Sequence, residues 1–332
     1  MKHILKVAAA LMAITVAGSM CWAAPILQET ARIPMPGVKG RIDHLAVDPA
    51  GKRLFVAALG NGSVEVIDLE AQKVVQHLTD LGEPQGVLVI PGSKRLVVTD
   101  GEADHATVYD TGDLAPVARV PIPEDGDNVR LEGANGRIWV GAGAHSSSAL
   151  VAIDPANGKV TDKIGLAGHP ESFQLEQQGS RIYVNVPTAL RIQVVDRHEK
   201  KVIGNWSVPA TMNFPMALDE QSKRLFVGTR APARLIVFDT DSGKTVATMP
   251  AVGDTDDVFY DSQTRRVYVS GGEGAVQVFR QESADRYTLV ETVPTRKGAR
   301  TALFAPAQRT LFVAVPREGQ EIAEIRVFSV AP

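Results

Sequence analysis

A repeat of about 42 residues constrains the fold of this chain more than any other feature. Each copy carries an anchor in which a basic residue precedes three apolar residues. The anchors begin at Arg53, Arg95, Arg137, Arg181, Arg224 and Arg266, and a seventh copy, without the arginine, begins at Thr310. Their spacings are 42, 42, 44, 43, 42 and 44 residues, and an acidic residue closes the next strand in five copies, at Asp68, Asp110, Asp154, Asp196 and Asp239. Two features that stay in phase over so many copies indicate one repeated structural unit.

Each copy has the pattern of four short β-strands. In the first copy we expect strands at 44–47, 54–58, 64–67 and 73–78, separated by turn residues such as Asn61-Gly62. Units of this size with four strands are typical of β-propellers. We therefore predict an all-β, seven-bladed β-propeller of four-stranded antiparallel blades. The last copy ends at its third strand, so we expect residues 26–33 to complete that blade and close the ring.

Two stretches of the repeat resemble YVTN-type repeats: Phe55-Val-Ala-Ala-Leu-Gly-Asn-Gly-Ser-Val-Glu-Val-Ile-Asp68 and Gly82-Glu-Pro-Gln-Gly-Val87. Over all seven copies the chain resembles the YncE-like family of exported propellers. The resemblance implies the fold but says little about function, because its motif consists of strand and turn residues. Most such proteins have no defined function, and one is associated with DNA binding. This chain departs from that case in its acidic charge and its 5% aromatic content.

The N-terminus has the order of a secretory signal peptide. Lys2 and Lys6 precede an apolar stretch, residues 7–18, which is followed by small residues. The apolar stretch is too short for a membrane anchor. We predict cleavage after Ala23, a periplasmic or secreted protein, and a single propeller domain over residues 24–332. A lipoprotein attached through Cys21 is the alternative, although Met20 stands where a small residue is expected.

Charge and cysteine content exclude several classes of function. Removal of residues 1–23 takes away two lysines and no acidic residue, so the formal charge changes from −3 to −5. It also removes the only cysteine. We therefore expect no disulfide, thiol nucleophile or cysteine-based metal site in the mature domain. A mildly acidic chain without a basic stretch also argues against nucleic acid as the main partner.

The repeat superposes polar residues at the start of the seven innermost strands. Ten residues before each anchor are Asp43, Gln85, Asp127, Glu171, Phe214, Asp256 and Arg300, and one residue later are His44, Gly86, Asn128, Ser172, Pro215, Asp257 and Thr301. In a propeller these positions converge on one mouth of the central channel. We predict a ligand-binding site there, formed by Asp43, His44, Gln85, Asn128, Arg130, Glu171, Asn213, Asp256, Asp257 and Arg300. Simple solvation of a water-filled channel is the alternative.

The chemistry of this ring favours a cation or a polar small molecule. Carboxylates suit Ca²⁺ or Mg²⁺, and an added imidazole would admit Zn²⁺. The candidate metal ligands are Asp43, His44, Glu171 and Asp256, with His169 as a further donor. Arg130 lies within an inner strand, where we expect it either to pair with an acid or to bind an anion.

Three functions remain open at this point. The first is a monomeric periplasmic protein that binds a small polar molecule, a metal ion or a partner protein. The second is a metal-dependent hydrolase or lyase that resembles lactonase-type propellers, with Asp43, Asn128, Glu171, Asn213 and Asp256 around the ion and His44 as general base. The third is an accessory protein of a periplasmic redox system, by analogy with quinoprotein propellers. Fold analogy does not choose among them.

Overall fold

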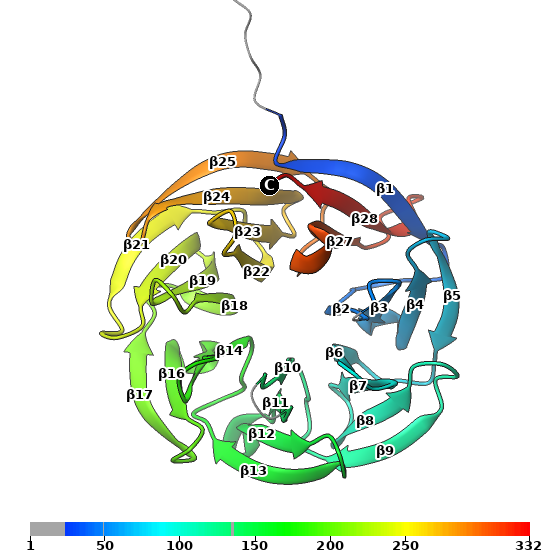
Figure 1. Cartoon of the computed structure of the whole chain (residues 1–332), viewed down its shortest axis with the longest axis horizontal. Coiled ribbons are helices and arrows are strands. Elements are labelled where there is room, and N and C mark those ends of the chain that lie inside the picture. Colours follow the sequence, from blue (N-terminus) through cyan, green and yellow to red (C-terminus); the bar gives the residue numbers. More distant parts are fainter. Residues whose placement is uncertain (1–23, 49, 134–135) are drawn as a thin grey trace, which may run out of the picture.

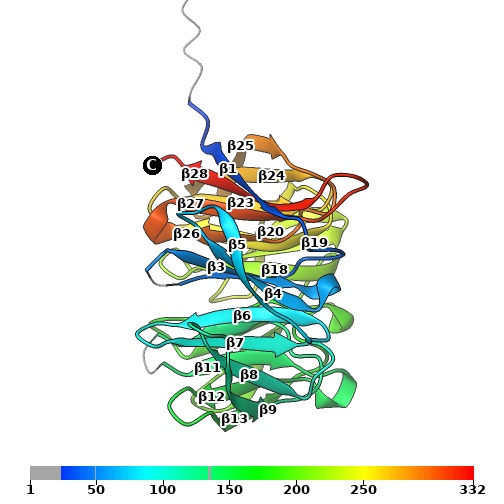
Figure 2. The same ribbon diagram turned by 90° about the vertical axis from the view of Figure 1, so that its right-hand side faces the viewer.

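A computed structural model describes residues 24–48, 50–133 and 136–332. The predicted signal peptide, residues 1–23, lies outside the described residues. Seven four-stranded sheets form a ring around a central channel (Figure 1). Seen from the side, the ring is a flat disc in which the strands of neighbouring blades lie in layers (Figure 2). The prediction of a seven-bladed antiparallel propeller is confirmed.

In each blade the strands follow one another from the channel outwards. The first blade is β2 (Leu45–Val47), β3 (Arg53–Ala58), β4 (Ser63–Asp68) and β5 (Lys73–Leu78). The second is β6 (Pro84–Ile90), β7 (Arg95–Asp100), β8 (His105–Asp110) and β9 (Pro116–Pro121). The third is β10 (Val129–Leu131), β11 (Ile138–Ala142), β12 (Ala149–Asp154) and β13 (Lys159–Gly165), and the fourth is β14 (Phe173–Leu175), β15 (Arg181–Val186), β16 (Arg191–Asp196) and β17 (Lys201–Ser207).

The remaining blades contain longer strands. The fifth is β18 (Thr211–Asp219), β19 (Arg224–Ala231), β20 (Ala233–Asp239) and β21 (Thr245–Pro250), and the sixth is β22 (Thr255–Asp261), β23 (Arg266–Gly271), β24 (Ala275–Ser283) and β25 (Arg286–Pro294). The seventh is β26 (Ala302–Ala305), β27 (Thr310–Val315), β28 (Ala323–Val330) and β1 (Leu27–Met35). Single 3₁₀ turns occur in the loops as η1 (Leu59–Asn61), η2 (His145–Ser147), η3 (Pro187–Ala189) and η4 (Pro306–Gln308).

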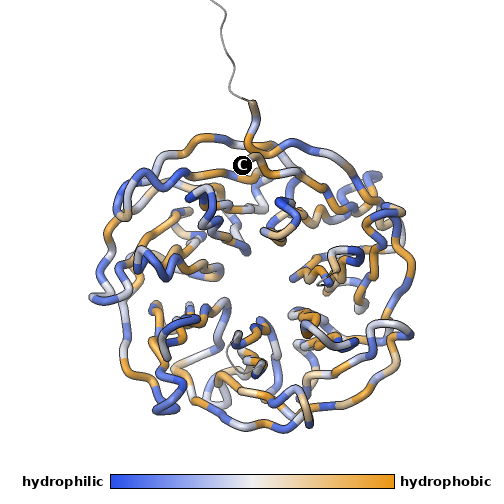
Figure 3. The backbone as a smooth tube through the Cα atoms, viewed as in Figure 1, coloured by the Kyte–Doolittle hydropathy of each residue, from blue (hydrophilic) through white to orange (hydrophobic). Residues whose placement is uncertain are grey.

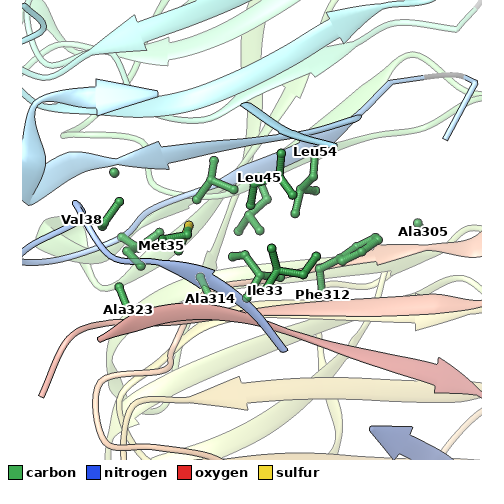
Figure 4. Close-up of a cluster of buried hydrophobic side chains, with 14 residues drawn as sticks. Ile33, Met35, Val38, Leu45, Leu54, Ala305, Phe312, Ala314 and Ala323 are labelled. Atoms are coloured by element: carbon green, nitrogen blue, oxygen red, sulfur yellow. The ribbon is translucent and has the colours of Figure 1, made fainter. Parts of the chain in front are cut away.

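The N-terminal strand closes the ring. β1 pairs antiparallel with β28 along the outer edge of the seventh blade, from Leu27 opposite Val330 to Met35 opposite Ala323. This confirms the predicted closure, with the strand two residues longer at its C-terminal end than expected. Ile33 and Met35 point inwards and pack with Leu54 of the first blade and Phe312 of the seventh (Figure 4). Because the strand joins the two ends of the chain, its loss would open the ring.

The apolar core consists of layers between blades. Seven buried clusters occur among the described residues, one at each contact between neighbouring blades. The backbone tube coloured by hydropathy shows apolar and polar residues alternating along the strands (Figure 3). Each sheet therefore buries side chains on both faces, which a single blade could not do alone.

The arginine that begins the anchor links neighbouring blades in several of the repeats. Arg181 pairs with Glu176 at 2.7 Å, lies 5.4 Å from the ring centre of Tyr183, and donates a 2.6 Å hydrogen bond to the carbonyl of Thr240 in the next blade. Arg53 and Arg266 likewise donate to backbone carbonyls of the next blade, those of Thr111 and Ala331. The arginine thus acts at the end of the channel opposite to the candidate site, since it follows the inner strand whereas the site residues precede it.

Candidate functional site

The residues that precede the inner strands gather at one mouth of the channel. A small depression there is lined by Arg41, Asp43, His44, Asp127, Asn128, Glu171, Ser172, Phe214 and Asp256. Backbone hydrogen bonds extend the sheets beyond the strands and fix these residues. Asp43 N donates to Ala57 O at 2.7 Å, Asp127 N to Gly141 O at 2.9 Å, and Glu171 N to Asn185 O at 3.1 Å. The depression encloses a volume of about 20 Å³, the space that one water molecule needs.

His44 of the first blade lies at the centre of a carboxylate cluster. Its Nε2 is 3.6 Å from Oδ1 of Asp43 and 3.5 Å from Oδ1 of Asp127, and its Nδ1 is 3.8 Å from Oδ1 of Asp257. The amide of Asn128 lies 2.9 Å from Nε2 of the same ring. The imidazole therefore connects the first, third and sixth blades across the channel.

The charges of this cluster are strongly coupled. Burial opposes protonation of His44, but the carboxylates of Asp43, Asp127 and Asp257 outweigh it and raise its pKa to about 10. Burial also opposes ionisation of Asp127, yet its hydrogen bond with His44 and the charges of His44 and His169 lower its pKa. Burial raises the pKa of Asp257 to about 7, although His44 and the N–H of Ala302 favour its ionised form. At neutral pH His44 is therefore an imidazolium, which makes it a poor general base.

Two arginines neutralise other acids of the mouth. Arg41 pairs with Asp43 at 2.5 Å, and Arg230 pairs with Asp256 at 2.5 Å and with Asp254 at 3.3 Å. Arg230 also lies over the ring of Phe214, 4.3 Å from its centre. Burial raises the pKa of Asp256 to about 6, with Arg230 opposing the shift. Half of the Arg41 side chain is exposed, so this residue forms the outer rim of the depression.

Glu171 differs from these acids because its carboxyl group has no partner. Within the described part of the chain it forms no side-chain hydrogen bond and no ion pair, although it lines the depression. Burial and the neighbouring charges of Asp127, Asp256 and Asp43 raise its pKa well above the usual range. The amide of Asn128 faces Nε2 of His44, and because the imidazolium is a donor there, the fitting orientation of this amide has Oδ1 accepting from His44. The mouth thus presents one carboxyl group, that of Glu171, without a partner among the described residues.

Comparison with known proteins supports the fold and no more. No protein-family model matches the chain, and no curated protein matches it. Among solved structures, the chain is similar to Kuenenia stuttgartiensis hydrazine synthase, with a TM-score of 0.73 and 16% identity over 88% of this chain and 96% of that one. It is also similar to the RRP9 WD40 repeats (TM-score 0.79, 10% identity, 92% and 100% covered) and to U3-55K (0.78, 10%, 90% and 98%). At these identities the likeness shows a propeller fold. The resemblance to the YncE-like family stays a prediction.

The structure brings together part of the predicted site. Asp43, His44, Asn128, Glu171 and Asp256 line one depression. Asp257 lies just beside it, in contact with His44.

Four predicted residues occupy other positions. Gln85 donates a 3.3 Å hydrogen bond to Asp125, and Arg300 pairs with Asp254 at 2.7 Å. Asn213 is fully buried between the fourth and fifth blades, where its Nδ2 donates to Oδ1 of Asn185 at 2.9 Å. Arg130 lies deeper in the channel. Neither Asn213 nor Arg130 lines the depression itself.

Two arginines of the mouth were missed by sequence reasoning. Arg41 stands two residues before Asp43, and Arg230 follows its repeat's anchor by six residues, at the end of β19. Neither position belongs to the superposed ring. The pairing could have been recognised only from an arginine that stands near an acidic residue in the sequence. Asp127 belonged to the ring but was not among the predicted ligand-binding residues.

The predicted metal ligands do not form a preorganised metal centre. Within the described residues, no group of three His, Cys, Asp or Glu donors converges closely enough to hold an ion. Asp43 and Asp256 are each engaged with an arginine, which competes with a metal for the same oxygen atoms. Over the same residues, no helix is long and apolar enough to cross a bilayer.

Proposed function

We propose that this protein is an exported binding propeller that holds a small molecule by a cationic amino group at the channel mouth. The observation that carries the proposal is the carboxyl group of Glu171, which lines the depression without a hydrogen bond or an ion pair. Every other acid around it has a nearby cation or donor: Asp43 has Arg41, Asp256 has Arg230, and Asp127 has His44.

An ammonium group fits this site in size and in charge. The enclosed space of about 20 Å³ is that of one water molecule, which is also the size of an ammonium head group. Its N–H donors would bind the unpaired carboxylate of Glu171. The rest of the ligand would lie outside the depression, against the half-exposed side chain of Arg41. A bound cation would also favour the ionised form of Glu171, so binding should release a proton and strengthen as the pH rises.

Calorimetry with methylammonium and ethanolamine tests the proposal on the mature protein. We expect binding to the wild type and a loss of about tenfold or more in Glu171→Gln, because the charged acceptor is lost. The matched control is Glu70→Gln, which removes an exposed carboxylate from the β4–β5 turn at the opposite end of the blade. Equal affinity in wild type and Glu171→Gln, or no binding of either amine, would exclude this function.

The hydrolase alternative needs a metal ion, for which the described residues offer no preformed centre. Elemental analysis of protein purified without chelator separates the two functions. A stoichiometric divalent metal that is lost in Glu171→Gln would replace the amine site by a metal site. The likeness to hydrazine synthase is one of fold, and no residue described above supports a redox role.

A further inference from the structure

The channel below the mouth is a separate, mostly apolar cavity. It has a volume of about 400 Å³, within the range of small-molecule sites. Its wall is formed by the inner strands of all seven blades, and the apolar residues along it include Leu88, Phe259 and Leu303. Water in such a cavity gains few hydrogen bonds, so an apolar ligand would displace it favourably.

One charged side chain interrupts this wall at a position that the repeat makes comparable in all blades. Arg130 lies opposite Trp139 in its sheet. The equivalent residues, each opposite the third residue of the anchor, are Ala46, Leu88, Gln174, Ala217, Phe259 and Leu303. None of these six is charged. The propeller fold therefore does not require an arginine at this position.

The positive charge of the Arg130 guanidinium has few partners. It donates one hydrogen bond, from Nη1 to the carbonyl of Val129 at 3.0 Å, and lies 5.7 Å from the ring centre of Phe173. Among the described residues no carboxylate oxygen lies within 4 Å of it, so the predicted pairing with an acid is not formed. The carboxylates of Asp257 and Asp127 act on it only from a greater distance, and burial lowers its pKa. The Arg130 side chain is half-buried along the channel, where its guanidinium remains charged and the loss of water around it is costly without a paired anion.

We propose that the channel binds a small monocarboxylate, whose carboxylate pairs with Arg130 and whose apolar body fills the cavity. The flat, forked guanidinium matches a carboxylate with two parallel hydrogen bonds. Asp257 lines the same cavity and would repel an anion when it is ionised. Its pKa of about 7 allows it to take up a proton when the anion binds, which removes that repulsion. This site and the amine site differ in their charged anchor, because Glu171 does not line the channel cavity, although His44 and Ser172 line both.

The test uses the mature protein and hexanoate as the probe, with hexanol as an uncharged probe of the same length. Calorimetry should show that hexanoate binds the wild type and that hexanol binds about tenfold more weakly or not at all. Arg130→Met should weaken hexanoate binding by about tenfold or more, whereas Arg130→Lys should keep part of it. Arg119→Met removes an exposed arginine of β9 and serves as the matched control.

Three results would overturn the proposal: no hexanoate binding to the wild type, equal affinity in Arg130→Met, or equal affinity for hexanol. Should Arg130→Met fail to fold, the comparison of hexanoate with hexanol on the wild type still decides. Failure of the amine experiment leaves the prediction for hexanoate intact, because the two probes are read out by different variants.

Discussion

The amide of Asn128 lies 2.9 Å from Nε2 of His44, a residue 84 positions earlier in the chain and two blades away. The contact crosses the mouth of the channel and joins two blades that are not immediate neighbours. It places the imidazole among Asp43, Asp127 and Asp257, so a single protonated ring holds three acids together. The stability of the mouth should therefore depend on the charge of His44.

Replacement of His44 by Gln should remove a pH dependence of stability on the alkaline side. The pKa of His44 is about 10 in the folded protein and about 6.5 in the unfolded chain. Its stabilising charge is thus fully present below pH 6.5 and is lost as the pH rises through 10. Each unit of pKa difference corresponds to roughly 1.4 kcal/mol. The free energy of unfolding of the wild type should therefore fall by several times this amount as the pH rises from 6.5 to about 10.

Urea unfolding at pH 6, 8 and 10 measures this effect. His44→Gln should be less stable than the wild type at pH 6 and should approach it at pH 10. His198→Gln is the control, because His198 lies in an exposed turn. A constant difference between His44→Gln and wild type over this range would show that the imidazole is not charged in the folded protein.

Asp257→Asn should act at lower pH, and its slope has the same sign as that of His44, because both groups bind their proton more tightly in the folded protein. Burial raises the pKa of Asp257 to about 7 in the folded protein, above its usual value of about 3.9. A raised carboxyl pKa means that folding is favoured when the group is protonated, so the wild type should lose stability as the pH rises from 4 to 7. The amide of the variant still accepts the N–H of Ala302, which Asp257 accepts at 2.8 Å. The free energy of unfolding should therefore fall less steeply in the variant over this range, as urea titrations would show.

The fold was predictable because the repeat sets the register of every blade. Spacing alone identified seven blades, the closing strand and the ring of positions at the channel mouth. The same pattern placed an acidic residue at the end of the strand after each anchor in five copies. Two of these residues, Asp68 and Asp154, accept hydrogen bonds from the backbone N–H groups of the turns that follow them.

The site was less predictable because irregularities break the equivalence of the blades. β-bulges lie before the regular part of the inner strands at Pro84–Val87, Asn213–Met216 and Thr255–Asp257. A bulge inserts extra residues and redirects their side chains. Gln85 and Asn213 lie in or beside such bulges and do not line the depression. The pairing of the acids was also not predictable from the repeat, since Arg41 approaches Asp43 from a loop and Arg230 approaches Asp256 from the end of β19, both outside the ring of repeat positions.

Arg181→Met should show that the repeated arginine holds the blades together. The variant leaves the buried carboxylate of Glu176 with Tyr183 as its remaining side-chain donor and removes the hydrogen bond to Thr240 of the next blade. Loss of one partner of such a pair costs roughly 3 kcal/mol. Arg95→Met is the control, because Arg95 pairs with the partly exposed Asp110 of its own blade. We expect this substitution to cost less than about 1 kcal/mol. Equal costs in urea unfolding would contradict a special role of the bridging arginine.

Export should yield a mature chain that begins at or near Ala24. The charged start, the short apolar stretch and the small residues before this position predict cleavage there. Mass spectrometry of the periplasmic fraction of the producing cells gives the N-terminus directly. Recovery of the protein in the membrane fraction with a lipid on Cys21 would instead establish the lipoprotein alternative.

Ile33→Ala should destabilise the whole propeller, because β1 closes the ring. Ile33 is 1% exposed and packs between the seventh and first blades, against residues that include Leu54 and Phe312 (Figure 4). Truncation of a buried isoleucine to alanine costs about 2–5 kcal/mol, which urea unfolding would measure. Gln28→Ala changes an exposed side chain of the same strand and should cost less than about 0.5 kcal/mol. Deletion of residues 25–35 should go further, since it exposes the edge of β28 and invites pairing between molecules. A monomeric deletion variant with unchanged stability would show that the ring does not depend on this closure.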